Sequence, residues 1–300
     1  MTFPADRVAG APISWGVCEV PGWGHQMTPG RVLSEMRSLG LGATELGPDG
    51  FLPEASARTL LADHRLALVA GFVPAVLHDE VPLGRELDAI ASSADLIAGL
   101  GGRTLVLAAA TGRHGYEAAE RLDADAWSAL ARGIDRVVEL AAARDLRVAL
   151  HPHHGTVVVR PEDVDRLLQV STVGLCLDTG HVMVGGGDPL AIARGAAGRV
   201  VHVHLKDVST TLAERVAAGT LGYRDAVREG LYRPLGDGDL DVAAVVRTLE
   251  ESGYDGWYVL EHDEVLEDEP EEGSGPIGNV RHSLAFLERT WEEVGAATRG

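Results

Sequence analysis

Short apolar runs alternate along this chain with longer segments of helical period. The eight apolar runs are "APISWG" (11–16), "ATELG" (43–47), "LALVAGFVP" (66–74), "RTLVLAAA" (103–110), "RVALHP" (147–152), "VGLCLD" (173–178), "RVVHVHL" (199–205) and "GWYVLEH" (256–262). Runs that are apolar almost throughout are typical of parallel strands buried on both faces. Residues 123–145 instead place apolar side chains at steps of three and four, which predicts an amphipathic helix. Eight strand–helix units predict an α/β fold, a closed (β/α)8 TIM barrel.

The barrel is expected to form a single domain over residues 1–300, a common length for this architecture. The alternative is a doubly wound open sheet, but no GxGxxG turn follows the first run. The glycine-rich "VGGGDP" (184–189) lacks the Lys-Ser/Thr ending of a phosphate loop and is predicted to lead into a helix starting near Asp188 and Pro189. The acidic run at 263–276 is predicted to be a solvated loop before the final helix.

Composition limits the possible partners. A formal net charge of −19 disfavours nucleic acid and acidic membranes, so a small molecule is the expected ligand. No window approaches the ~20 apolar residues of a membrane span. The first residues have no apolar signal-peptide core, and the two cysteines, Cys18 and Cys176, suit a reducing compartment, so we expect a cytoplasmic protein without disulfides. A homo-oligomer is compatible with these data.

Ionisable residues gather where four successive apolar runs end. They are His151, His153 and His154 at the fifth run, Asp178 and His181 at the sixth, His202, His204, Lys206 and Asp207 at the seventh, and Glu261 and His262 at the eighth. In a barrel the carboxyl ends of the strands share one rim, so these groups are expected to converge there. Imidazoles and carboxylates together suit a divalent cation such as Mn, Co, Mg, Fe or Zn.

Each of these residues also has a structural interpretation. A lone histidine at a strand end is more often a hydrogen-bonded core residue, and an aspartate before Thr-Gly is more often a helix cap. Four ionisable groups at the inward ends of four consecutive strands would cost several kcal/mol if they were left unpaired. Their coincidence therefore favours a shared metal ion.

Several motifs carry a resemblance to a known family. "CLDTGH" (176–181), "VHVHLKD" (201–207), "PLGDGDLD" (234–241) and "YDGWYVLEHD" (254–263) resemble the xylose-isomerase-like barrels of the sugar isomerases and epimerases. Together with "ISWG" (13–16), residues 32–53 and "HPHHGT" (151–156), they resemble the inosose dehydratases, which act on 2-keto-myo-inositol in inositol catabolism. The resemblance covers nearly the whole chain and implies a metal-dependent lyase that acts on a sugar or cyclitol.

The resemblance also implies a set of metal ligands. Asp178, His204 and Glu261 match ligands of the epimerases, whose fourth ligand is a glutamate at strand five. This chain has His151 there, so either His151 is the fourth ligand or the metal uses His153 or water. Because the epimerases use two glutamates as paired acid and base, the loss of one favours dehydration over epimerisation.

The remaining roles are assigned only in part. Glu45 is expected to be a base or a hydroxyl binder, His181 and His153 to contact substrate or move a proton, and Lys206 to stabilise an enolate or pair with Asp207 or Glu261. Trp15, Phe72 and His202 are predicted substrate contacts, and Trp23 and His25 are predicted to form a lid or a packing contact.

Three functions remain open from the sequence: a lyase that dehydrates a cyclic keto-polyol, a sugar isomerase or epimerase on the same barrel, and a non-catalytic polyol-binding barrel. They differ in their products and not in their fold.

Overall fold

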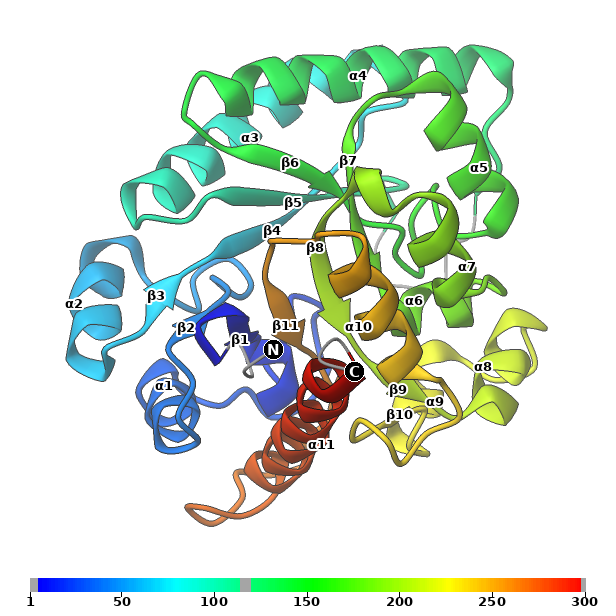
Figure 1. Ribbon diagram of the computed structural model, residues 1–300. Helices are drawn as coiled ribbons and strands as arrows, with labels where there is room; N and C mark the ends of the chain where they lie inside the picture. Colours follow the sequence, from blue (N-terminus) through cyan, green and yellow to red (C-terminus); the bar gives the residue numbers. More distant parts are fainter. Residues whose placement is uncertain (1–4, 114–119, 298–300) are drawn as a thin grey trace.

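The computed structural model describes residues 5–113 and 120–297. Nine parallel strand segments form a nearly closed barrel, with helices around its outside (Figure 1). In sheet order the segments are β3 (Ala67–Leu68), β2 (Ala43–Thr44), β1 (Val8–Gly10), β11 (Tyr258–Leu260), β8 (Val200–Leu205), β7 (Gly174–Asp178), β6 (Arg147–Leu150), β5 (Thr104–Ala109) and β4 (Ala70–Ala75). The predicted α/β barrel is confirmed.

The barrel closes within the single apolar run predicted at 66–74. The two outer segments of the sheet, β3 and β4, are separated only by Val69. The Val69 N–H donates to the Thr44 carbonyl at 3.0 Å, and the Arg103 N–H donates to the Val69 carbonyl at 3.1 Å. One irregular strand therefore pairs with β2 through its first half and with β5 through its second half.

The helices lie outside the barrel, as their apolar periodicity requires. They are α1 (Pro29–Ser38), α2 (Glu54–His64), α3 (Glu80–Gly99), α4 (Ala124–Ala142), α5 (Pro161–Val170), α6 (Thr179–Val184), α7 (Pro189–Gly195), α8 (Thr210–Ala217), α9 (Tyr223–Arg228), α10 (Val242–Glu251) and α11 (Pro276–Ala297). In α4, Trp127, Leu130, Ile134 and Val137 are buried on one face, and Asp123 caps the first turn. The predicted start of α7 is confirmed, with Asp188 as its cap. No helix in the described part of the chain is long and apolar enough to cross a membrane.

The first strand differs from its prediction. We expected a strand at 11–16, whereas β1 ends at Gly10 and Pro12–Trp15 form a 3-10 turn. Proline has no N–H to donate to a neighbouring strand, and Gly16 ends the turn with a φ of 75°. The apolar character of this stretch therefore reflects burial against the barrel end and not strand pairing.

Small side chains fill one layer of the barrel interior. They leave room for polar groups in the next layer, nearer the carboxyl ends of the strands. This inner layer contains Ala9, Ala43, Ala70, Val106, Ala149, Cys176 and Val259, all buried. Both cysteines are free thiols, as expected. The ionisable residues of the rim lie one layer further along the same strands.

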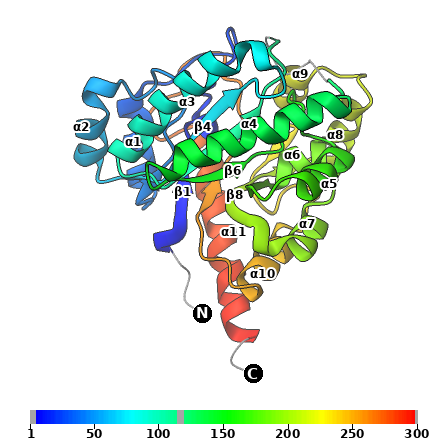
Figure 2. The same cartoon turned by 90° about the horizontal axis from the view of Figure 1, so that it is seen from above.

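An insertion after β8 builds a second, smaller core. It runs through β9 (Asp207–Val208), α8, α9 and β10 (Tyr232–Arg233), and β9 pairs with β10 in an antiparallel ribbon. Tyr223, Leu231 and Tyr232 pack there against Trp23 from the loop that follows β1. Figure 2 shows α8 and α9 at the opposite end of the molecule from the two chain termini.

Candidate active site

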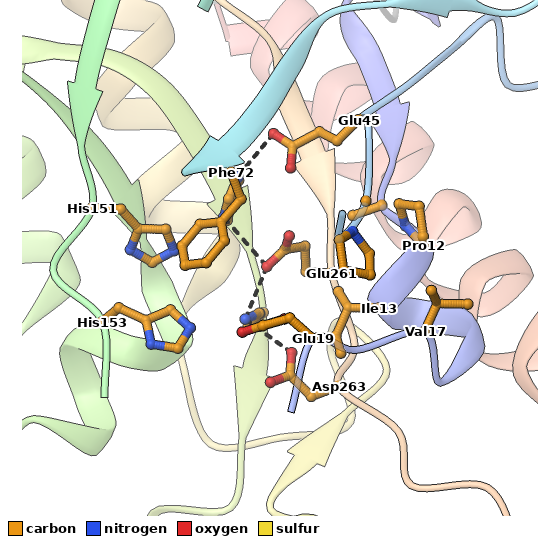
Figure 3. Close-up of a pocket in the computed structure, with 15 residues that line it drawn as sticks. Pro12, Ile13, Val17, Glu19, Glu45, Phe72, His151, His153, Glu261 and Asp263 are labelled. Carbon is orange, nitrogen blue, oxygen red and sulfur yellow. Dashed lines mark hydrogen bonds and ion pairs between the residues drawn. The ribbon is translucent and has the colours of Figure 1, made fainter. Parts of the chain in front are cut away.

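A pocket opens at the carboxyl ends of the strands (Figure 3). Its walls come from the loop after β1 and from the ends of β2, β4, β6, β8 and β11. The lining residues are Ala11, Pro12, Ile13, Val17, Glu19, Glu45, Gly47, Pro48, Phe72, His151, His153, His204, Lys206, Glu261 and Asp263. Seven of the predicted site residues therefore line this pocket: Glu45, Phe72, His151, His153, His204, Lys206 and Glu261.

Four of the predicted metal ligands converge at one point beside the pocket. His204 Nδ1 lies 3.5 Å from Asp178 Oδ2 and 3.3 Å from Glu261 Oε2, and His151 Nε2 lies 3.5 Å from Asp178 Oδ2. Asp178 Oδ2 and His204 Nδ1 are buried and make no hydrogen bond within the described residues, although Lys206 Nζ forms an ion pair with Asp178 Oδ2 at 3.2 Å. Buried polar atoms are nearly always satisfied, so His204 Nδ1 and the carboxylates that face it could take a cation between them. Asp178, His204 and Glu261 have ligand atoms within 4.8 Å of one another, and His151 Nε2 adjoins this group through Asp178, so the donors fit a divalent metal ion.

The hydrogen bonds around the imidazoles fix which nitrogen faces this point. His151 Nδ1 lies 2.8 Å from the Pro152 carbonyl, so it carries the proton and leaves the Nε2 lone pair directed at Asp178. His204 Nε2 lies 3.0 Å from Glu45 Oε1 and leaves Nδ1 directed at Asp178 and Glu261. A ligating histidine usually donates its second N–H to a carbonyl or carboxylate, and both residues have this arrangement.

Asp178 serves two purposes. Its Oδ1 accepts the His181 N–H at 2.8 Å and caps α6, as the structural interpretation of "LDTGH" expected. Its Oδ2 faces the imidazoles of His151 and His204. Burial alone raises the pKa of Asp178, but the Lys206 ammonium and the neighbouring imidazoles hold it well below its usual value.

Glu45 contacts two histidines of β8 and not only the pocket. Its Oε1 accepts from His202 Nε2 at 2.7 Å and from His204 Nε2 at 3.0 Å. Although burial opposes ionisation, these imidazoles hold the pKa of Glu45 well below its usual range. A carboxylate with two N–H donors on one oxygen orients His204 and is a weak base. His202 is fully buried and does not line the pocket, so the predicted substrate contact lies beneath the site instead.

Lys206 contacts three carboxylates. Its Nζ lies 3.2 Å from Asp178 Oδ2, 2.8 Å from Glu261 Oε2 and 2.9 Å from Asp263 Oδ1. Burial alone would lower the pKa of Lys206, but the carboxylates raise it well above its usual value. The predicted pairing with Glu261 is present, whereas that with Asp207 is not. Asp207 instead accepts backbone N–H groups from the "PLGDGDLD" segment.

The rings of His153 and His181 are tilted by 37° with their centroids 3.8 Å apart, and only His153 faces the pocket. His153 Nδ1 lies 2.7 Å from the His154 carbonyl, which leaves Nε2 as an acceptor. Burial lowers the pKa of both imidazoles well below the usual value, so both are neutral at pH 7. His181 lies behind His153, one layer further from the pocket than we expected.

The two predicted apolar wall residues have different positions. Phe72 lines the pocket and lies 5.5 Å from the His153 ring centroid. Trp15 is fully buried in the main core, where its Nε1–H donates to Glu35 Oε2 at 2.8 Å. Trp15 therefore does not line this pocket, whereas Pro12 and Ile13 of the same turn do.

The predicted lid residues are packed into the molecule. Trp23 is buried, its Nε1–H donates to the Glu264 carbonyl at 2.7 Å, and Arg224 Nε donates to the Trp23 carbonyl at 2.9 Å. The His25 N–H donates to the Leu266 carbonyl at 2.7 Å. The loop after β1 is therefore tied to the acidic segment and to α9, which supports the packing alternative.

Sequence reasoning missed Asp263 and Tyr223. Asp263 was placed in a solvated loop, yet it is buried and lines the pocket, and its Oδ2 accepts the Tyr223 hydroxyl at 2.8 Å. The signal was available, because residues two apart in an extended segment point the same way and Asp263 follows Glu261 by two. The acidic run that begins at Asp263 led us to assign this residue to a solvated loop instead. Tyr223 comes from the insertion after β8 and has no sequence signal of its own.

Comparison with known proteins finds a matching family, related sequences and similar structures. Residues 33–290 match the family described as xylose isomerase-like TIM barrel. The chain is 35% identical to the rhizopine catabolism protein MocC of Rhizobium meliloti over 85% of this chain and 81% of that protein. It is 32% identical to the inosose dehydratase of Geobacillus kaustophilus over 85% of this chain and 86% of that protein. Among solved structures, an L-ribulose 3-epimerase superposes with a TM-score of 0.73 at 18% identity, covering 100% of this chain and 97% of that one.

Proposed function

The chain belongs to the xylose isomerase-like TIM barrel family, and from this membership we propose that it is a metal-dependent hydro-lyase that dehydrates a cyclic keto-polyol such as 2-keto-myo-inositol. The observation that carries the proposal is the convergence of His151, Asp178, His204 and Glu261 beside the pocket. The inosose dehydratase relatives, matched over most of their length, supply the substrate class.

In this proposal the four converging residues hold one divalent ion. The donor that supports this assignment most directly is His204 Nδ1, which makes no hydrogen bond within the described residues and faces carboxylate oxygens of Asp178 and Glu261. When bound, the ion acts as a Lewis acid toward a ketone oxygen and acidifies the adjacent C–H bond. The two carboxylates would balance the charge of a divalent ion, and the two imidazoles would each offer it one nitrogen.

The base in this proposal is His153. It lines the pocket, is neutral, and directs an unprotonated Nε2 away from the carbonyl that fixes its Nδ1–H. Dehydration removes one proton from the carbon next to the ketone and releases the β-hydroxyl, which needs one proton to leave as water. The proton taken by His153 is thus the proton that the departing hydroxyl requires, and one imidazole balances the reaction without a redox partner.

Lys206 and Phe72 complete the pocket. The Lys206 ammonium supplies a permanent positive charge near the oxygen on which the negative charge of the enolate develops. Phe72 offers an apolar surface to one face of the substrate ring, and the carboxylates of the wall accept substrate hydroxyls.

Epimerisation is the second candidate and is less well supported. The resemblance to the epimerases implies two glutamates that act on opposite faces of the sugar, and His151 stands where one of them is expected. The structural likeness to the L-ribulose 3-epimerase, at 18% identity, concerns the fold alone.

The test is incubation of the purified protein with 2-keto-myo-inositol and Mn²⁺, Co²⁺ or Zn²⁺, followed by ultraviolet absorbance of the dione product. We expect dione formation with metal and its loss after chelation. His153→Gln should lower kcat by about 10²–10⁴-fold, whereas the neighbouring His154→Gln, outside the pocket, should keep kcat within about threefold. Epimerised ketoses without dione, or metal and polyol binding without any turnover, would each contradict the lyase.

A further inference from the structure

Lys206 is the only lysine in the chain, because the other 25 of the 26 Lys and Arg residues are arginines. Its side chain is buried, with 2% exposed. A guanidinium is a rigid planar fork, whereas an ammonium is a compact charge on a flexible stem that can contact several carboxylates and move between them. The only lysine ammonium of the sequence therefore lies in the candidate site.

The backbone of Lys206 is fixed while its side chain has room. The Lys206 N–H donates to Thr179 Oγ1 at 2.9 Å, and the same hydroxyl donates to the Lys206 carbonyl at 2.6 Å. A Cβ atom on Gly180 would lie 2.7 Å from Lys206 Cβ and 3.1 Å from its Cδ. The glycine of "LDTGH" thus leaves space for the lysine stem, and the bonds to Thr179 fix where the stem begins.

The ammonium shares its oxygen partners with the proposed metal. Lys206 Nζ contacts Asp178 Oδ2 at 3.2 Å and Glu261 Oε2 at 2.8 Å. These are the same two oxygens that face His204 Nδ1. Because like charges repel, a divalent cation at these oxygens and an ammonium at these oxygens are competitors.

Asp263 offers the ammonium a partner outside the metal cluster. Its Oδ1 lies 2.9 Å from Lys206 Nζ, and its Oδ2 is held by the Tyr223 hydroxyl at 2.8 Å. Lys206 Nζ also lies 5.2 Å from the ring centroid of Tyr232, whose hydroxyl contacts that of Tyr223. An anchored carboxylate and an aromatic face therefore stabilise a cation on this side of the pocket.

We propose that Asp263 is a positioning residue that retains the Lys206 ammonium on the Tyr232 side of the pocket when a divalent cation takes Asp178 and Glu261. The inference rests on the metal site of the proposed function. Without Asp263 the ammonium has partners only among the metal ligands and displaces the metal from them. With Asp263 both cations stay in the pocket, and Lys206 remains available to substrate oxygen.

The test is a double-mutant cycle on the dissociation constant for Mn²⁺, measured by titration calorimetry on the full chain without substrate. Lys206→Met should tighten Mn²⁺ binding about tenfold, because the competitor is gone. Asp263→Asn should weaken binding about tenfold in the wild-type background and change it less than about threefold in the Lys206→Met background. Glu264→Gln, which removes the neighbouring carboxylate without a Lys206 contact, is the matched control and should stay within about threefold.

The outcomes separate this inference from the proposed function. If Asp263→Asn weakens binding equally in both backgrounds, Asp263 acts on the metal directly and the inference is overturned; no effect in either background overturns it as well. If the wild type binds none of Mn²⁺, Co²⁺ and Zn²⁺, the proposed metal site fails and the inference fails with it. Circular dichroism and thermal melting confirm folding of each variant, and Lys206→Gln replaces Lys206→Met if the latter does not fold.

Discussion

The tautomer of each histidine determines what that side chain offers to the site. In "HPHHGT" both His151 and His153 place Nδ1 against the carbonyl of the next residue, at 2.8 and 2.7 Å. Both therefore present an Nε2 lone pair. Both residues line the pocket, but only His151 has that nitrogen at Asp178, at 3.5 Å, so His151 is the one placed for the proposed ligation.

This division predicts which histidine holds a metal. Asp178→Ala, His204→Ala and His151→Ala should each lower metal affinity by at least ~100-fold, since loss of an outer partner alone typically costs 10–100-fold. His153→Ala is the matched control and should retain metal. Equilibrium dialysis with elemental analysis provides the measurement. Undiminished metal in the Asp178 and His204 variants would exclude the site, and metal loss in His153→Ala with retention in His151→Ala would reassign the fourth ligand.

His154 predicts a pH dependence of stability. It stacks on Tyr223 with centroids 4.7 Å apart, and burial lowers its pKa to about 4. The unfolded chain binds this proton near pH 6.5, so the folded state loses stability as pH falls from 6.5 toward 4. Between pH 7 and pH 5 the loss from this residue is about 2 kcal/mol.

Urea unfolding at pH 7 and pH 5 tests this directly. His154→Gln should reduce the difference in unfolding free energy between the two pH values by about 2 kcal/mol. His282→Gln, at an exposed position on α11, should leave the difference unchanged. An unaltered pH dependence in His154→Gln would show that this imidazole is already charged in the folded protein.

At the level of elements, periodicity predicted most of the barrel. The seven later apolar runs each contain a strand, because buried parallel strands have few polar residues and stand out from amphipathic helices. The first run failed because hydrophobicity records burial and not hydrogen bonding, and the Pro12 turn is as buried as a strand. No feature of the sequence predicted that the third run would divide into two strand segments at Val69, because the division follows from the way in which the barrel closes.

The convergence of the site residues could be predicted from the sequence about as well as the barrel itself. Residues at strand ends converge in any barrel, so the convergence of His151, Asp178, His204 and Glu261 followed from the fold, whereas their selection as metal ligands rested on the resemblance to the epimerases. His202 is buried and does not line the pocket, because depth along a strand depends on the stagger between neighbours. The contacts of Tyr223 depend on how the insertion after β8 folds back, which one sequence does not encode locally.

The "PLGDGDLD" segment yields a prediction at this scale. Asp207 accepts N–H groups of Gly236, Gly238 and Leu240 at 2.9–3.1 Å, and a Cβ atom on Gly238 would lie 2.2 Å from Asp207 Oδ1. Gly238→Ala should therefore displace this carboxylate and lower the unfolding free energy by about 2–3 kcal/mol.

The matched control is Gly278→Ala. Gly278 lies exposed in α11 with no atom near the added methyl group, so the alanine should raise stability by about 0.5–1 kcal/mol. Denaturant titration of both variants distinguishes a specific clash from a general effect of alanine. Equal and small changes in both would mean that the segment moves aside and that Asp207 does not fix it.

At the scale of the whole molecule, the site joins segments that are far apart in sequence. Its cluster draws on β2, β6, β7, β8 and β11, and the second core closes over it through the Tyr223–Asp263 and Trp23–Glu264 hydrogen bonds. The loop after β1, the insertion after β8 and the segment after β11 are thereby held to one another. The segment after β11, which follows Glu261 directly, thus connects the barrel to its smaller core.

This connection predicts that the molecule unfolds as one unit, as the expected single domain requires. Urea unfolding without metal should give coincident midpoints by far-UV circular dichroism, which reports mainly the barrel, and by hydrogen exchange of α8 and α9, which reports the second core. Tyr223→Phe and Trp23→Phe remove the hydrogen bonds that link the cores while keeping most of the packing. In these variants the α8–α9 amides should exchange at lower free energy than the barrel amides. Separate transitions already in the wild type would show that the second core is an independent unit, and the positions of Asp263 and Lys206 would then depend on a part of the molecule that opens without the barrel.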